Sequence, residues 1–221
     1  MRVRWVVLLA VLGLFTAPAT ASAAAGTLPL PYSGDANQVI TVVAASPTAT
    51  TATLVAWKRT ATGWTAQIGP LKAYVGSGGV GQASEGSTKT PAGVWALTES
   101  FGHKPPVGSR LPYRQVDTSD WWVSDVNAAQ YNTPYRCAPG SCPFNEAAGE
   151  NLGKVGRAYD RAVVMDYNRS PVVKGAGSAF FLHVSTNQPT AGCVSLSAPL
   201  METVFNWLDP AAHPVINIGV A

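Results

Sequence analysis

Residues 181–196 read FLHVSTNQPTAGCVSL, in which an apolar run ends near His183 and a turn leads to Cys193. The apolar run favours a β-strand, which would hold the imidazole at the end of a rigid element. The turn-forming residues 189–192 can fold the chain so that Cys193 returns towards His183. We therefore expect the imidazole and the thiol to lie close together.

A cysteine beside a histidine has the chemistry of a nucleophile and its base. A free thiol has a pKa of about 8.5, so little thiolate exists at neutral pH. The imidazole of His183 can take the proton of Cys193, and the imidazolium then holds the thiolate. Gly192 removes a side chain beside the nucleophile, and the backbone N–H groups of Ala191, Gly192 and Cys193 can converge on an oxyanion. Residue types alone favour the alternative, a buried structural cysteine and a satisfied core histidine.

The rest of the chain predicts a mainly β fold. The 21 glycines and 17 prolines suit many short strands with turns between them. Strands are expected at residues 38–44, 52–58, 63–68, 72–75, 94–97, 162–167, 179–184 and 214–220. A long polar and aromatic region at 101–151 predicts extended loops.

One short helix is expected near the C-terminus. Leu200, Val204 and Leu208 recur at i, i+4 and i+8, which is the spacing of an apolar helical stripe. Ser197 can cap the first turn, and residues 209–210, Asp-Pro, end the helix.

The N-terminal residues have the layout of a secretory signal peptide. Arg2 and Arg4 precede the apolar run 5–15, and small residues at 19–23 offer cleavage sites. The run is short for a bilayer span, although an uncleaved anchor is the alternative. We expect a signal peptide at 1–23, a loose arm at 24–36 and one domain at 37–221. The mature protein would be secreted, associated with the cell wall and without a stable membrane anchor.

Charge and glycine patterns argue against nucleotides and nucleic acids as partners. Without Arg2 and Arg4, 13 basic residues face 12 acidic ones, and no basic patch is visible. Residues 76–81 fit G-x-G-x-x-G, but a polar stretch, Pro91 and a further strand follow instead of a helix. We expect a flexible hairpin or rim at 76–87, and no cofactor.

Three cysteines are present in a chain expected in an oxidising compartment. Cys137 and Cys142 are five positions apart with a Pro-Gly turn between them, so they can close a small disulfide loop. A metal site is the alternative, but none of the three histidines lies at ligand spacing from this pair. Cys193 would then be the free thiol, which raises the question of its reactivity.

Two segments together resemble the YkuD-type L,D-transpeptidase family. Residues 190–194, TAGCV, after a strand ending in His183 are similar to its active-site motif, and residues 85–95, EGSTKTPAGVW, are similar to its G…TPxGxW/F signature. Further similar stretches are 121–125, 131–132 and 165–168, typical of the secreted branch without a separate wall-binding domain. The resemblance runs from about Val75 to the C-terminus. It implies a β-barrel or sandwich with one short C-terminal helix.

The sequence departs from the family pattern around the motif. Only six residues separate His183 from Thr190, where many members have a longer loop, so we expect a more open groove. Ala191 replaces a frequent His, and Ser195 replaces a frequent Arg or Asn. Substrate contacts of those side chains therefore cannot be carried over.

The resemblance implies two-step acyl transfer on peptidoglycan stem peptides. Cys193 would attack a stem tetrapeptide, D-alanine would leave, and an amine from a neighbouring stem would resolve the thioester as a 3→3 cross-link. A backbone carbonyl at Val184 or Ser185 would orient His183. Asp125, Asp160 and Asp166 are then read as structural residues.

The site should be recognisable by its geometry. The sulfur of Cys193 and a ring nitrogen of His183 should approach within about 4 Å, because a base must reach the proton it removes. They should face a groove, with residues 76–87, Trp95 or Tyr167 as candidate walls. Tyr167, Asn168 and Trp95 are the candidate substrate contacts.

Other functions remain open at this stage. An L,D-carboxypeptidase would use water in place of the amine, and a non-catalytic cell-wall-binding module could keep the same fold. A sortase needs an Arg after its nucleophile, but no Lys or Arg follows Lys174. A papain-like peptidase places Cys before His, the reverse of the order here. The sequence leaves the oligomeric state, the acceptor amine and the stem chemistry open.

Overall fold

The computed structural model describes residues 26–108 and 110–221. The predicted signal peptide at 1–23 lies outside these residues. Within the described ranges, none of the helices has the length and apolar character needed to cross a membrane.

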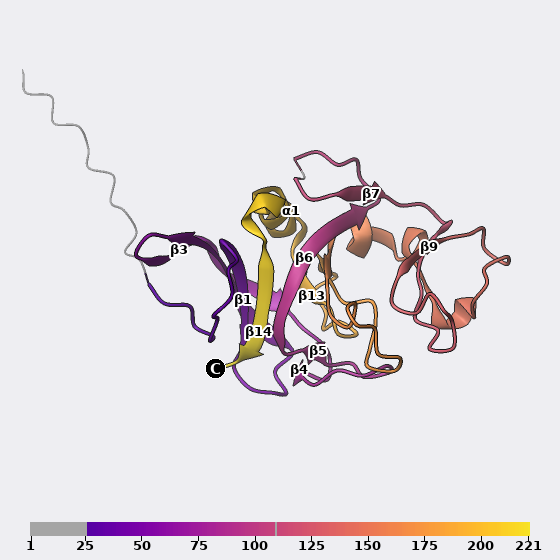
Figure 1. Ribbon diagram of the computed structural model, residues 1–221, viewed down its shortest axis with the longest axis horizontal. Coiled ribbons are helices and arrows are strands. Elements are labelled where there is room, and N and C mark those ends of the chain that lie inside the picture. Colours follow the sequence, from indigo (N-terminus) through magenta and orange to yellow (C-terminus); the bar gives the residue numbers. More distant parts are fainter. Residues whose placement is uncertain (1–25, 109) are drawn as a thin grey trace, which may run out of the picture.

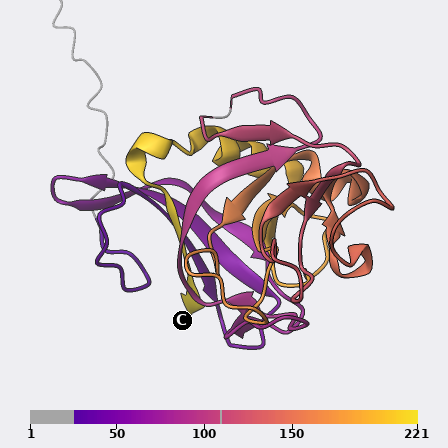
Figure 2. The same ribbon diagram turned by 45° about the vertical axis from the view of Figure 1, so that its right-hand side comes forward.

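One large sheet dominates the molecule, which confirms the mainly β prediction. Its strands are β1 (Gln38–Ala44), β2 (Thr51–Thr60), β3 (Gly63–Tyr74), β6 (Gly93–Gly102), β7 (Tyr113–Gln115), β11 (Ala162–Met165), β12 (Phe181–Val184), β13 (Val194–Leu196) and β14 (Val215–Val220). The order across the sheet is β11-β12-β13-β3-β2-β1-β14-β6-β7. Because β11 also pairs with β6, the strands curl into a barrel-like sheet (Figure 1, Figure 2).

The main core forms where apolar side chains from these strands meet. Ile40, Leu54, Leu182 and Ile216 come from β1, β2, β12 and β14 and are fully buried in it. Burial of a large aliphatic side chain contributes about 1.5–3 kcal/mol, so this cluster holds the sheet closed.

The predicted helix is present as α1 (Ala198–Trp207), and Figure 1 shows it at one end of the barrel. It buries Met201, Val204 and Phe205. Val204 belongs to the expected apolar stripe, and Phe205 is next to it in the sequence. Ser197 is the N-cap residue, but its hydroxyl makes no capping hydrogen bond. A 3-10 turn, η4 (Pro210–Ala212), follows the helix and leads to β14.

A second layer covers the other face of β11 and β12. It contains the small sheet β10-β8-β9 and three 3-10 turns, on the side of β6 away from β1 and β3 (Figure 1). Trp122 and Tyr159 pack edge-on against Phe181, with ring centroids 5.0 and 5.7 Å apart. The elements are β8 (Asp120–Trp122), β9 (Pro134–Arg136), β10 (Glu150–Asn151), η1 (Glu146–Ala148), η2 (Leu152–Lys154) and η3 (Gly156–Asp160).

Two peripheral features bear on the sequence predictions. Residues 26–36 contact the barrel, since Gly26 pairs with Trp64 through two backbone hydrogen bonds of 2.8 and 3.0 Å. A disulfide joins Cys137 and Cys142, whose Cα atoms are 5.4 Å apart, which confirms the predicted pairing. Within the described ranges, no three His, Cys, Asp or Glu residues are grouped as a metal site would require.

Candidate active site

His183 lies on β12, and Cys193 directly precedes β13, the parallel neighbour of that strand. Leu182 of β12 is aligned with Val194 of β13, and His183 with Ser195. Strands lie about 4.8 Å apart and rise about 3.3 Å per residue, so extending the ladder by one residue to Cys193 puts its Cα atom ~8 Å from that of His183. Alternation places both on the face of Phe181, whose N–H donates to the Cys193 sulfur at 3.4 Å. Side chains at this separation can meet.

The histidine is held in one tautomer by its own strand. Nδ1 of His183 lies 2.8 Å from the carbonyl oxygen of Val184. Because a carbonyl can only accept, Nδ1 carries the proton and Nε2 of the neutral ring is free to accept one. The Tyr159 ring packs edge-on against the imidazole at 5.6 Å and restricts it further. Val184 is thus the residue whose carbonyl contacts the ring, whereas Ser185 makes no such bond, and the orienting role stays a prediction.

The resting pair is neutral. Burial raises the pKa of the Cys193 thiol to about 12, and the negative charge of Glu150 adds to the increase. Burial also lowers the pKa of His183, only partly offset by the bond to Val184. The sulfur lies 3.5 Å from the carbonyl oxygen of Ala179, a partner for an S–H donor. Desolvation thus opposes the charged form of both groups, the thiolate and the imidazolium.

A groove of about 370 Å³ opens beside the cysteine. Four short segments line it: 84–88, 147–150 with Ser124, 178–180 and 191–193. Part of the Gly-rich segment therefore forms a wall, as expected. Cys193 is 9% exposed and borders both this groove and an apolar cluster, whereas His183 does not line the groove.

The turn before the cysteine is fixed by threonine hydroxyls. Thr190 donates to the Cys193 carbonyl at 2.6 Å and accepts from the Gly192 N–H at 3.1 Å. The buried hydroxyl of Thr90 lies 3.3 Å from the same carbonyl and accepts from Gly76 N–H at 2.7 Å. The Gly192 amide is thus engaged at rest, while Ala191 and Cys193 line the groove beside it.

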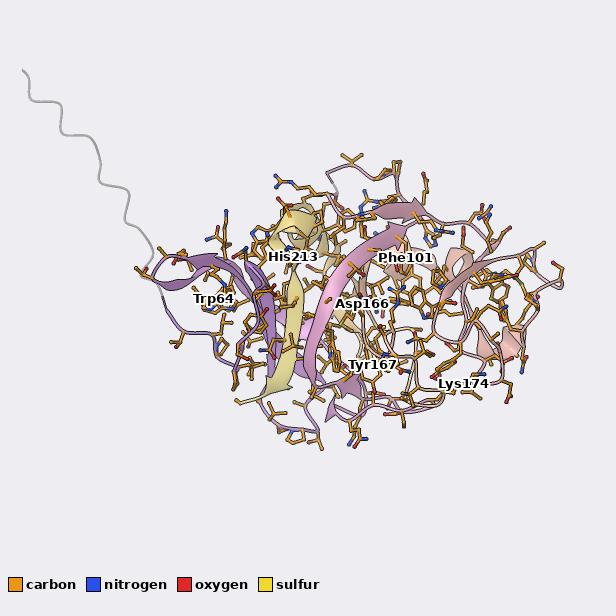
Figure 3. The ribbon with its side chains drawn as sticks, viewed as in Figure 1. Trp64, Phe101, Asp166, Tyr167, Lys174 and His213 are labelled. Carbon is orange, nitrogen blue, oxygen red and sulfur yellow. A yellow bond between two sulfur atoms is a disulfide. The ribbon has the colours of Figure 1, made fainter. Side chains whose placement is uncertain are left out.

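Of the three candidate substrate contacts, Tyr167 packs edge-on against Phe180, a residue of the groove wall, with ring centroids 5.0 Å apart. Trp95 and Tyr167 pack edge-on with centroids 4.9 Å apart, and Figure 3 shows Tyr167 beside β6. The Tyr167 hydroxyl donates to the Ala176 carbonyl at 2.7 Å. The Asn168 amide donates to Val173 and Gly177 carbonyls at 2.9 and 2.8 Å. None of the three lines the groove, so a substrate role for them stays a prediction.

The three aspartates read as structural make structural contacts. Asp166 binds Thr98 at 2.9 Å and Arg169 at 2.7 Å, at the position labelled in Figure 3. Asp125 accepts from backbone N–H groups, and Asp160 pairs with Lys104 at 3.1 Å.

Two glutamates of the groove were not anticipated from the sequence. Glu85 accepts hydrogen bonds from the Tyr131 hydroxyl and, at 3.1 Å, from Ser178. Glu150 accepts from the Tyr159 hydroxyl at 2.8 Å, and burial raises its pKa to about 7. Glu85 belongs to the quoted signature, but Glu150 lies in a polar region without a motif.

Comparison with known proteins identifies the family. The family model for the L,D-transpeptidase catalytic domain, YkuD, matches residues 40–216. The match covers most of the chain, so the protein belongs to this family of L,D-transpeptidase-type enzymes, whose substrate class is peptidoglycan. No curated protein and no solved structure matches the chain significantly.

Proposed function

We propose that the protein is an exported cysteine acyltransferase that forms 3→3 peptidoglycan cross-links. The observation that carries the proposal is the placement of Cys193 and His183. His183 lies on β12 with Nδ1 bound to Val184, which leaves Nε2 to accept a proton, and Cys193 lies at the groove directly before the neighbouring strand β13. A base fixed in this way can remove the thiol proton when an acyl donor occupies the groove.

In the first step Cys193 attacks the carbonyl of the third residue of a stem tetrapeptide. Its proton passes to Nε2 of His183, a C–S bond forms, and the oxyanion meets the N–H groups of Ala191 and Cys193, since that of Gly192 is held by Thr190. The imidazolium then protonates the nitrogen of D-alanine as the C–N bond breaks. A thioester on Cys193 and a neutral His183 remain.

In the second step an amine from another stem attacks the thioester. His183 takes a proton from the attacking nitrogen, the C–S bond breaks, and the thiol is restored. Water in place of the amine would make the protein an L,D-carboxypeptidase.

Product analysis tests the proposal. The mature protein is incubated with disaccharide-tetrapeptides, and the products are weighed by mass spectrometry. We expect a cross-linked dimer that has lost one D-alanine, and no product with Cys193→Ala. Disaccharide-tripeptide alone would identify a carboxypeptidase, and no product from a folded wild type would favour the wall-binding module.

A further inference from the structure

Glu150 is a groove carboxyl that the two-step mechanism does not use. It lines the same groove as Cys193 and comes from β10, whose partner strand β8 aligns it with Trp122. Its Oε1 accepts the Tyr159 hydroxyl at 2.8 Å. Among the residues the structure describes, Oε2 has no hydrogen-bond partner. One oxygen is therefore held in place and the other is available to a ligand.

The ionisable groups around this carboxyl are few. Tyr159 of η3 donates a hydrogen bond to it, its charge raises the pKa of Cys193, and the ring of His183 on β12 packs against that of Tyr159. Arg114 of β7 and Arg136 of β9 pair with Asp120 instead. Among the described residues that line the groove, none is Lys or Arg. An ionised Glu150 would therefore attract a cation that enters the groove.

Acyl transfer between amines needs a second proton acceptor. A primary amine enters as R–NH3⁺ and must lose one proton before its lone pair can attack the thioester. A further proton leaves the nitrogen after attack, and His183 takes that one. Free D-alanine is likewise an ammonium ion in neutral solution, so the departing amine needs a second proton in addition to the one from His183.

We propose that Glu150 is a catalytic residue that carries this second proton, taking it from the acceptor ammonium and giving it to the departing D-alanine. The inference rests on the proposed transpeptidase function. Protonated Glu150 releases its proton to D-alanine, which leaves as an ammonium ion and leaves behind a carboxylate beside the thioester. The carboxylate then binds the acceptor ammonium and removes one proton. The neutral amine attacks, His183 takes the last proton and passes it to the sulfur, and the resting state returns.

The raised pKa of Glu150, about 7, suits this exchange because the carboxyl both binds and releases a proton near neutral pH. Glu85, the other carboxyl of the groove, is already bound by Tyr131 and Ser178. These hydrogen bonds occupy Glu85, so Glu150 is the groove carboxyl that is available for proton transfer.

A competition between two acceptors tests the proposal. The enzyme receives a stem tetrapeptide together with a primary alkylamine, protonated at neutral pH, and methoxyamine, which is not. Both acceptors react with the same acyl-enzyme, so the ratio of the two products is independent of the acylation rate. We expect the ratio of alkylamine product to methoxyamine product to be on the order of 10²-fold lower in Glu150→Gln than in the wild type, which is the size of a general acid–base contribution.

Controls separate the inference from structural effects and from the proposed function. Glu99→Gln removes a carboxylate that pairs with Arg169 and does not line the groove, and it should leave the ratio unchanged. Tyr159→Phe removes a hydrogen bond that favours ionised Glu150. When the product ratio is measured as a function of pH, the midpoint of its change should therefore lie at a higher pH in this variant. An equal ratio in wild type and Glu150→Gln, or an unmoved midpoint in Tyr159→Phe, overturns the role of Glu150. A wild type that transfers to neither acceptor overturns the proposed function instead.

Discussion

Glu150 should make the stability of the fold depend on pH. Its pKa is about 7 in the folded protein and 4.5 in the reference state. The folded state therefore binds more protons between these values, so stability is lost as pH rises from about 4.5 through 7. At 1.36 kcal/mol per unit, the full loss is about 3 kcal/mol. This figure is an upper bound, because Glu150 borders the groove and water reaches part of it.

Replacement by glutamine removes the charge and keeps an oxygen that can accept from Tyr159. Free energies of unfolding are measured in urea at pH 5 and pH 8 for wild type and Glu150→Gln. The difference between the two proteins should change by up to about 3 kcal/mol between these pH values, with the variant gaining at pH 8. The lowered pKa of His183 costs stability as pH falls, but it acts in both proteins and cancels. Parallel pH curves for the two proteins would show that Glu150 does not titrate in this range.

Three further outcomes are expected. Alkylation of the unreduced mature protein should add one label, at Cys193, because Cys137 and Cys142 are joined; a label on either of those two would contradict the pairing. A carbapenem, an activated acyl donor, should add one adduct to the intact protein and none to Cys193→Ala, as read by mass spectrometry. Gly192→Ala should destabilise the fold by about 1–3 kcal/mol in urea unfolding, since φ is +140° and a Cβ would lie 2.6 Å from Phe180; an unchanged midpoint would refute this strain.

Local patterns predicted the large elements well. The strand expected at 38–44 is β1 with the same limits, because its run of β-forming residues is continuous and is paired along its whole length by β2. The segments 63–68 and 72–75 were expected as two strands but form one, β3. Gly69 and Pro70 interrupt the apolar pattern there, yet the pairing with β2 resumes after a register shift. β13 was missed because its three residues are too few to show a period.

The candidate site was predictable only where it is local in sequence. His183 and Cys193 lie ten positions apart, and a turn between them is readable from Pro189 and Gly192. Glu150 reaches the same groove from a polar loop region because it pairs with Trp122, and Tyr159 then binds it. Such pairing between segments of a long loop has no signature in one sequence. The catalytic roles themselves stay predictions that the experiments above address.

The short parallel pair β12 and β13 allows the loop between the two strands to change in length while the imidazole and the thiol stay in place. The loop between the strands is tied at each end, by Ser185 N–H to the Leu196 carbonyl at 2.6 Å and by Thr190 N–H to the Val75 carbonyl at 2.9 Å. Residues 186–189 between these ties are exposed. Because the ladder and not the loop sets the distance from imidazole to sulfur, residues can be inserted at 186–189 without moving either group. A longer loop could therefore be grafted at this stretch to change access to the groove while the imidazole and the thiol keep their positions.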